Sequence, residues 1–423
     1  MTARSDEAQG YVAPAALYIH VPICASKCSY CDFFSVPASA LAEGFEGELV
    51  GAILARAESL AARFGAEAFE TVYIGGGTPS LLSLEGLDTL LCGVSVLSRG
   101  PGARPPREWT VEANPDSIGP EALALMRERG VTRLSLGVQS LDPDELALLG
   151  RRHGPSAALN AVRLASEAGL AVSADLLAGI PSSLEKLRSA PSGKLAGYAR
   201  ELLDAGATHI SVYDLTIEEG TPMAAARRRY SFPGEDEDWE ARRKLESILR
   251  DAGLRRYEVS NYAAVGNECR HNLAYWHMDS YLGAGPGAVS TIAGRRGTAL
   301  RIEEAKDVSG YRGRAGTEAV ETLIGLGDSV FESIMMAFRT SFGLDAEAFR
   351  RRFGLEATDL LDGSLASWRQ RIVAGEPWPG RDTSLGPALD GRGLDLLNRF
   401  LVDCLEEIER KLQDKTLKKS LEP

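Results

Sequence analysis

Short apolar runs alternate with longer amphipathic segments from the N-terminus to about residue 250. Six of the runs have the length and continuous apolar character of buried strands. They are residues 15–23, 70–77, 107–115, 131–140, 170–181 and 207–216. The segments between them repeat apolar residues every three or four positions, as amphipathic helices do. This order predicts a parallel sheet covered by helices, and six units without a dinucleotide fingerprint predict an α/β fold of the TIM type, a partial (β/α)6 barrel.

The pattern changes in the last third of the chain. Residues 330–344 and 394–412 have helical periodicity, and residues 375–393 form a turn-rich connection between them. We therefore expect three parts: a disordered N-terminus over residues 1–14, the barrel over residues 15–300, and a small, mostly helical domain over residues 301–423. A second domain of this kind is expected to close against the barrel and help to cover its site.

Composition indicates the size of the core, the kind of partner and the cellular environment of the protein. A chain of 423 residues with 44% hydrophobic content is long enough to bury a large core. A net charge of −12 argues against a binder of nucleic-acid phosphates. Three of the six cysteines are crowded together and three are scattered, which indicates a reducing, cytoplasmic environment rather than a disulfide framework. The N-terminus is polar and no apolar run approaches the roughly 20 residues of a membrane span, so we expect no secretory signal and no transmembrane segment.

Polar or glycine-rich residues follow each of the six predicted strands. They are the loop with Cys24, Cys28 and Cys31, the turn Gly75 to Pro79, Glu112 with Asn114, Gln139, Asp175, and Tyr213 with Asp214. Taken singly, each has a structural explanation, since glycines make turns and carboxylates or amides cap helices. In a parallel barrel, however, the C-terminal ends of the strands carry the chemistry. Their joint placement at one rim therefore predicts a functional site there.

Cys24, Cys28 and Cys31 have C-x3-C-x2-C spacing and no fourth cysteine nearby. A structural zinc site needs four ligands, and a redox disulfide needs only two thiols. An iron–sulfur cluster with one iron left open to a chelating ligand fits three thiolates better.

This spacing, placed after the first strand of a partial barrel, resembles the signature of the radical S-adenosylmethionine (SAM) superfamily. "GGGTP" after the second strand supports the resemblance. It implies that the three cysteines hold a 4Fe-4S cluster, that SAM chelates the open iron, and that Tyr30 lies near the adenine. In the superfamily the electron from the cluster cleaves SAM to a 5′-deoxyadenosyl radical.

Further segments resemble the oxygen-independent coproporphyrinogen III oxidase family, and within it the haem chaperone (HemW) branch. They include "YIHVPIC", "VEANPD", "RLSLGVQSLD", "HISVYDLTIEEGTPM" and "YEVSNYA". The resemblance runs from Ala16 to Ala288 and more loosely to the C-terminus. The SAM contacts that it implies are Tyr18, Gly76, Gly77, Thr78, Glu112, Gln139, Arg151, Asp175, Leu215 and Val289. Carboxylates such as Glu112 and Asp175 can accept hydrogen bonds from an amino group or from ribose hydroxyls.

Three features favour the chaperone branch over the oxidase. Only about fifteen residues precede the first strand, Phe33 stands where the oxidase pattern has a further cysteine, and "HNLAYW" matches the H-N-x-x-Y-W motif of the chaperones. The match implies that His271 is a haem iron ligand and that Tyr275 and Trp276 contact the porphyrin. From the residues alone, a surface or capping histidine is the simpler interpretation of His271. Val289 departs from the family, which has a histidine at that position.

The resemblance thus implies a haem chaperone that binds haem and a SAM-chelated 4Fe-4S cluster and passes haem to an acceptor, for example a respiratory-chain component. The alternative is an oxidase that decarboxylates porphyrinogen propionates, and a third interpretation is a barrel with a purely structural cluster. We assign no catalytic residue, and we expect no nucleic-acid partner. Peripheral contact with a membrane is compatible with this interpretation.

Overall fold

Six parallel strands form the centre of a twelve-stranded sheet in the computed structural model, which describes residues 10–42, 44–99, 104–183, 194–314, 319–381 and 385–413. The central strands are β1 (Ala16–Val21), β4 (Thr71–Gly76), β5 (Glu108–Ala113), β6 (Arg133–Gln139), β7 (Ala171–Ala178) and β9 (His209–Asp214). Each lies within one of the six predicted runs and pairs in parallel with the next. The predicted partial barrel is confirmed.

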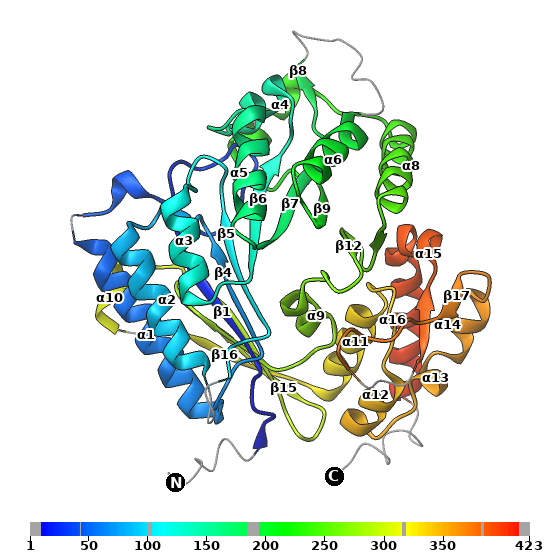
Figure 1. Cartoon of the computed structure of the whole chain (residues 1–423). Helices are drawn as coiled ribbons and strands as arrows, with labels where there is room; N and C mark the ends of the chain where they lie inside the picture. Colours follow the sequence, from blue (N-terminus) through cyan, green and yellow to red (C-terminus); the bar gives the residue numbers. More distant parts are fainter. Residues whose placement is uncertain are drawn as a thin grey trace.

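Amphipathic helices cover the outer face of these strands (Figure 1). They are α1 (Phe45–Phe64), α2 (Leu84–Ser98), α3 (Pro120–Arg129), α5 (Pro155–Glu167), α6 (Lys194–Asp204) and α8 (Glu235–Asp251). On α1 the buried residues Leu49, Ile53 and Leu60 recur at helical spacing and join one core with Leu17 and Ile19 of β1. Ser83 caps the start of α2, where its side chain accepts a 3.0 Å hydrogen bond from Gly86 N.

Further strands extend the sheet on both sides of these six, and all but β13 pair antiparallel. β12 (Asn261–Ala264) and β11 (Leu254–Arg256) follow β9, and β13 (Tyr281–Ala284) pairs in parallel with β1. β14 (Val289–Ala293), β15 (Ala299–Glu303) and β16 (Val320–Ile324) continue from β13, and α10 (Val308–Arg314) packs against α1. The domain boundary expected at residue 300 therefore falls inside β15, and the sheet extends to Ile324.

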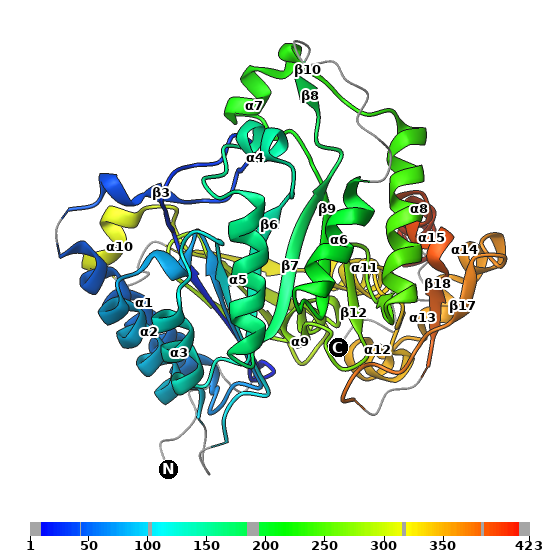
Figure 2. The same ribbon diagram turned by 45° about the horizontal axis from the view of Figure 1, so that its top comes forward.

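The shorter elements connect these parts, and all of them except β2 are labelled in Figure 2. They are β2 (Ile23–Cys24), β3 (Val36–Pro37), α4 (Pro143–Leu149), β8 (Ser182–Ser183), α7 (Pro222–Ala225), β10 (Tyr230–Ser231) and α9 (Arg270–Trp276). Of the N-terminus expected to be disordered, residues 1–9 lie outside the described residues. Tyr11, by contrast, forms a β-bridge with Gly294, so the ordered chain begins before β1.

The C-terminal region is mostly helical and lies beside α9 and β12 in both views (Figures 1 and 2). Its elements are α11 (Leu326–Ala337), α12 (Ala346–Phe353), α13 (Ala357–Leu360), α14 (Asp362–Ser367), β17 (Ile372–Ala374), β18 (Pro387–Leu389), α15 (Gly391–Asp395) and α16 (Leu397–Gln413). It has its own apolar core around Phe338 and Phe400. Backbone hydrogen bonds join it to the barrel, from Val259 N to Arg339 O (3.0 Å) and from Ser341 N to Tyr257 O (2.9 Å).

No helix in the described part of the chain is long and apolar enough to cross a membrane.

Candidate functional site

The cysteine loop lies over the C-terminal ends of the parallel strands. It leaves the barrel after β1, and the pairing of β2 with β3 brings its two ends together. The side chains of Cys24, Cys28 and Cys31 are half-buried there. They line a cavity of about 430 Å³, which is within the ~300–1,000 Å³ usual for small-molecule sites.

Most of the residues that the sequence suggested for cofactor binding line this one cavity. They are Cys24, Cys28, Cys31, Gly76, Gly77, Thr78, Glu112, Gln139, Arg151, Asp175 and Leu215, and Tyr30 and Phe33 lie among them. Tyr18 and Val289 do not line it. The Tyr18 hydroxyl lies 2.9 Å from His20 Nδ1, and Val289 begins β14.

The glycine turn after β4 holds the cysteine loop through its backbone. Gly77 N donates to Val21 O (2.9 Å) and Thr78 N donates to Ile23 O (2.7 Å). Gly76 has a φ of 107°, in the region that favours glycine, and a Cβ at Gly77 would lie only 2.5 Å from Ile23 O. The turn therefore needs glycine in order to pack against the segment that carries Cys24.

Glu112 in β5 and Asp175 in β7 present carboxylates to the cavity from either side of β6. Tyr73 donates a 2.7 Å hydrogen bond to Glu112 Oε1, and Gly76 N donates one of 3.1 Å to Oε2. Burial nevertheless raises the pKa of Glu112 to about 6, and burial also raises the pKa of Asp175. Both groups can accept hydrogen bonds from an amino group or hydroxyls of a ligand.

Arg151 connects two of the cysteines through a short hydrogen-bond chain. Its Nη1 lies 3.4 Å from Cys28 Sγ, and its Nη2 donates to Asn114 Oδ1 at 2.5 Å. Asn114 Nδ2 donates to Thr78 Oγ1 (3.0 Å), which in turn lies 3.8 Å from Cys24 Sγ. Arg151 therefore places a guanidinium beside Cys28 and links it through Asn114 and Thr78 to Cys24.

The site has further features that the sequence patterns predict only in part. The sequence indicates Asn114 only as a strand-end residue and gives no sign of Tyr73, because a bond between the side chains of adjacent strands leaves no local pattern. Gln139 has a φ of 68° beside a register shift between β6 and β7. A non-glycine residue in this region is uncommon and is a frequent feature of binding sites.

The donor set fits a multi-iron cluster better than a single metal ion. Within the described ranges, no three His, Cys, Asp or Glu side chains are grouped to hold one ion. A cubane cluster takes each thiolate on a different iron, so its cysteines need not converge on one point. Burial raises the pKa of the Cys31 thiol, and the neighbouring Cys28 and Cys24 raise it further. A cationic centre bound next to Cys31 would favour its thiolate form.

The three residues suggested for haem lie at the opposite end of the barrel. His271 is completely buried, with Nδ1 2.9 Å from Thr71 Oγ1 and Nε2 2.8 Å from the Tyr275 hydroxyl. Glu108, the first residue of β5, accepts hydrogen bonds from the backbone nitrogens of Arg270 and His271 and so fixes the start of α9. In this conformation His271 has no free ring nitrogen for an iron. Trp276, at the other end of α9, borders a separate cavity.

Comparisons with known proteins agree with this geometry. Residues 18–190 match the radical SAM superfamily and residues 327–370 match the HemN C-terminal domain. The chain is 40% identical to the heme chaperone HemW of Mycobacterium tuberculosis (strain H37Rv) over 283 residues, which is 65% of this chain and 69% of that protein. It is 36% identical to the heme chaperone HemW of Escherichia coli (strain K12) over 333 residues, 77% of this chain and 82% of that one.

Among solved structures, the chain resembles coproporphyrinogen III oxidase (HemN) from Escherichia coli. The TM-score is 0.72 at 18% identity, and the match covers 95% of this chain and 91% of that one. At this identity the likeness establishes a shared fold.

Proposed function

The chain belongs to the HemN/HemW family of radical SAM proteins, and from this membership we propose that it is a haem chaperone. The observation that carries the proposal is the 30–40% identity to several bacterial relatives named heme chaperone HemW. In this role the protein binds haem and passes it to an acceptor protein. We propose a cytoplasmic location, and a respiratory-chain component is one candidate acceptor.

We further propose that the cavity at the C-terminal ends of the strands holds a 4Fe-4S cluster and SAM. Cys24, Cys28 and Cys31 would ligate three irons, and the open iron would be available to SAM. Residues of this chain would position SAM. The glycine turn would let SAM approach the backbone, and Glu112 and Asp175 would accept hydrogen bonds from SAM. When bound, the cluster supplies electron-transfer chemistry.

The alternative within the family is a porphyrinogen oxidase. Phe33 distinguishes the chaperone from the oxidase, because it stands where the oxidase pattern has a further cysteine. Its apolar side chain borders the cavity and is 66% exposed. The cavity thus offers three thiols for one cluster and no fourth at this position.

Parallel assays on one anaerobically reconstituted sample test the proposal. We expect saturable haem binding and no detectable conversion of coproporphyrinogen III when SAM and a reductant are supplied. An authentic oxidase in the same buffer is the positive control. Sustained decarboxylation by this protein, without haem binding, would transfer the assignment to the oxidase.

A further inference from the structure

Helix α9 is short and depends on the contacts at its two ends. It has seven residues, and isolated helices of this length are at best marginally stable. At its start, Glu108 accepts hydrogen bonds from the backbone nitrogens of Arg270 (2.8 Å) and His271 (3.0 Å). At its end, the next residue, His277, contacts the C-terminal region. The position of His271 therefore depends on both attachments.

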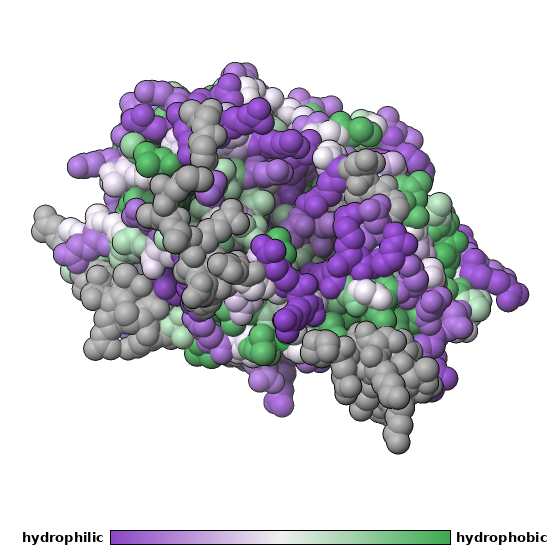
Figure 3. All heavy atoms as spheres, turned by 90° about the horizontal axis from the view of Figure 1, so that it is seen from below, coloured by the Kyte–Doolittle hydropathy of each residue, from purple (hydrophilic) through white to green (hydrophobic). Residues whose placement is uncertain are grey.

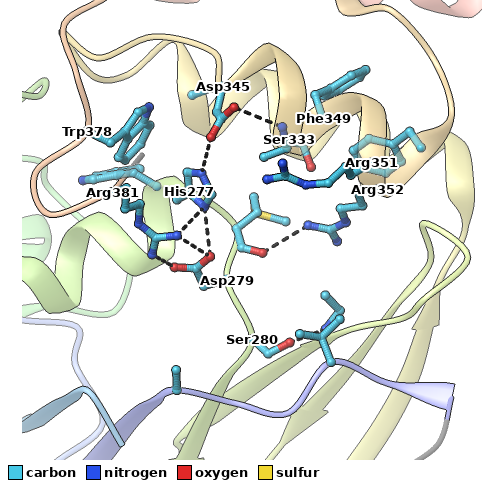
Figure 4. Close-up of a pocket in the computed structure, with 18 of the residues that line it drawn as sticks. His277, Asp279, Ser280, Ser333, Asp345, Phe349, Arg351, Arg352, Trp378 and Arg381 are labelled. Atoms are coloured by element: carbon cyan, nitrogen blue, oxygen red, sulfur yellow. Dashed lines mark hydrogen bonds and ion pairs between the residues drawn. The ribbon is translucent and has the colours of Figure 1, made fainter. Parts of the chain in front are cut away.

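His277 lies in a cluster of side chains that joins the barrel to the C-terminal region (Figure 4). Its Nδ1 lies 2.9 Å from Asp279 Oδ1, and its Nε2 lies 3.4 Å from Asp345 Oδ2. Arg381 pairs with Asp279 and places its Nη1 3.2 Å from His277 Nδ1. The Trp378 ring packs edge-on against the imidazole, with the ring centroids 4.9 Å apart. Since Asp345, Trp378 and Arg381 belong to the C-terminal region, the imidazole links the two parts of the protein.

The cluster forms part of the wall of a cavity of about 620 Å³ at the opposite end of the barrel from the cysteines. Ala15 and Glu70, which directly precede β1 and β4, line another side of this cavity. Figure 3 looks onto this end of the molecule, where hydrophilic side chains surround a central hollow. His277 is partly exposed, whereas Glu108 at the start of α9 is buried. Solvent can therefore reach the attachment at the end of the helix. The other charged residues of the cavity are Arg295, Arg351 and Arg352.

The surroundings of the imidazole favour its protonated form. Two carboxylates and one guanidinium face it, and an imidazolium can donate one hydrogen bond to each carboxylate. Burial by itself would lower the pKa of His277, but the hydrogen bonds with Asp279 and Asp345 raise it above the usual value. Once His277 loses its proton, one ring nitrogen has no hydrogen to donate and faces a carboxylate oxygen. The link between the barrel and the C-terminal region is then weaker.

The backbone directly after His277 is strained. Met278 has a φ of 58°, which is uncommon for a residue other than glycine. Arg352 Nη1, from α12, donates a 3.1 Å hydrogen bond to the carbonyl oxygen of Met278. Backbone in this conformation persists only where the surrounding structure holds it, and it is frequent in segments that switch. The turn at Met278 can therefore act as a hinge for α9 when the C-terminal region lets go.

From this geometry we propose that His277 is a positioning residue whose contact with Asp345 keeps α9 in the orientation that buries His271, and that loss of this contact frees His271 for the haem iron. The inference rests on the proposed function, because it concerns the access of haem to α9. With the contact in place, both ring nitrogens of His271 are occupied, by Thr71 and Tyr275. The form that binds haem is then a minor state, and the apparent haem affinity is reduced by the fraction of molecules in that state.

Titration of the full-length protein with ferric haem at pH 7.5 tests this role. His277→Gln removes the imidazolium and should tighten the apparent haem affinity about three- to tenfold, because it raises the fraction with α9 released. Asp345→Asn should have a similar effect and still cap α12, since asparagine caps helices as well as aspartate does. The double variant should gain no more than either single variant, because both substitutions act on one contact. A purely structural role predicts the opposite sign, weaker binding in every variant.

Hydrogen exchange of the haem-free protein tests the same contact without the ligand. The raised pKa of His277 means that the contact is intact below the usual pKa and is lost as the pH rises through the raised value. After correction for intrinsic rates, the amides of α9 should therefore exchange about tenfold faster at pH 9 than at pH 6. His277→Gln should exchange fast at both pH values. Asp395→Asn is the matched control, because it breaks a different ion pair between the two parts, with Arg256 of β11 (2.8 Å), and it should behave as wild type.

The outcomes separate this inference from the proposed function. If the wild-type protein fails to bind haem, the chaperone assignment fails and the inference fails with it. If the wild type binds haem while His277→Gln and Asp345→Asn bind it no more tightly and exchange α9 no faster, the inference is wrong and the assignment stands. Weaker haem binding in both variants would likewise overturn the inference and leave the assignment intact.

Discussion

Arg151 Nη1 lies 3.4 Å from Cys28 Sγ, and this contact ties the cysteine loop to the start of the segment that follows α4. The guanidinium also donates to Asn114 Oδ1 and Gly137 O, so it is held between β5 and β6. A fixed positive charge at this distance stabilises negative charge on the thiolate and on whatever the thiolate ligates.

Arg151→Met should therefore lower the cluster content after anaerobic reconstitution and shift the reduction potential of any retained cluster to more negative values. Iron and sulfide analysis with a redox titration checks this. Cys28→Ala should lose the cluster altogether, whereas Arg152→Ala, which changes a more exposed neighbour near Asp116, should behave as wild type. An unchanged potential in Arg151→Met would show that the contact has no electrostatic role.

Gly77→Ala should reduce both cluster content and SAM binding. The new Cβ would lie 2.5 Å from Ile23 O and 2.8 Å from Ile23 N, so the backbone before Cys24 has to move. Gly47→Ala is the matched control, because a Cβ there meets nothing within 4 Å on the exposed face of α1. Wild-type iron content and SAM affinity in Gly77→Ala would mean that the turn tolerates a side chain.

SAM affinity should fall as the pH drops below about 6, the pKa to which burial raises Glu112. Above this pH the ionised carboxylate can accept a hydrogen bond from the ligand's amino group, and below it the protonated form loses part of that interaction. Glu112→Gln should bind SAM about tenfold more weakly at pH 7.5 and show a smaller dependence on pH. Anaerobic calorimetry at pH 5.5 and 7.5 measures both effects. Asp116→Asn serves as a control, and a wild-type pH profile in Glu112→Gln would exclude Glu112 from the site.

His271→Ala should destabilise the protein by about 1–3 kcal/mol at pH 7.5, because it leaves the buried hydroxyls of Thr71 and Tyr275 without a partner. Burial lowers the pKa of His271 to about 3, so the folded protein keeps this residue neutral. The unfolded chain binds a proton near pH 6.5, and the contribution of His271 to stability is therefore present above that pH and declines as the pH falls. Urea unfolding at pH 7.5 and 5.5 should show a smaller loss on acidification in the variant. Equal stability of the two proteins at both pH values would contradict the burial of His271.

The barrel could be predicted from the sequence because it depends on local patterns, whereas the proposed SAM contacts were implied by the family resemblance. Apolar runs mark the strands, and residues at their C-terminal ends, such as Glu112 near the end of β5, meet at one rim. The orientation of α9 could not be predicted. It depends on Glu108, far away in sequence, which caps the helix and turns His271 into the barrel, while Trp276 borders the cavity near α12. The sheet also extends past the domain boundary expected at residue 300, because β15 and β16 continue the antiparallel pairing that begins at β14.

The most direct measurement of the haem chaperone assignment is an absorbance titration of the anaerobically reconstituted wild-type protein with ferric haem. We predict saturation at about one haem per chain, with a Soret band shifted by an imidazole ligand and with the iron–sulfur content unchanged. Haem absorbance that rises without saturation, or saturation that requires loss of the cluster, would contradict the assignment.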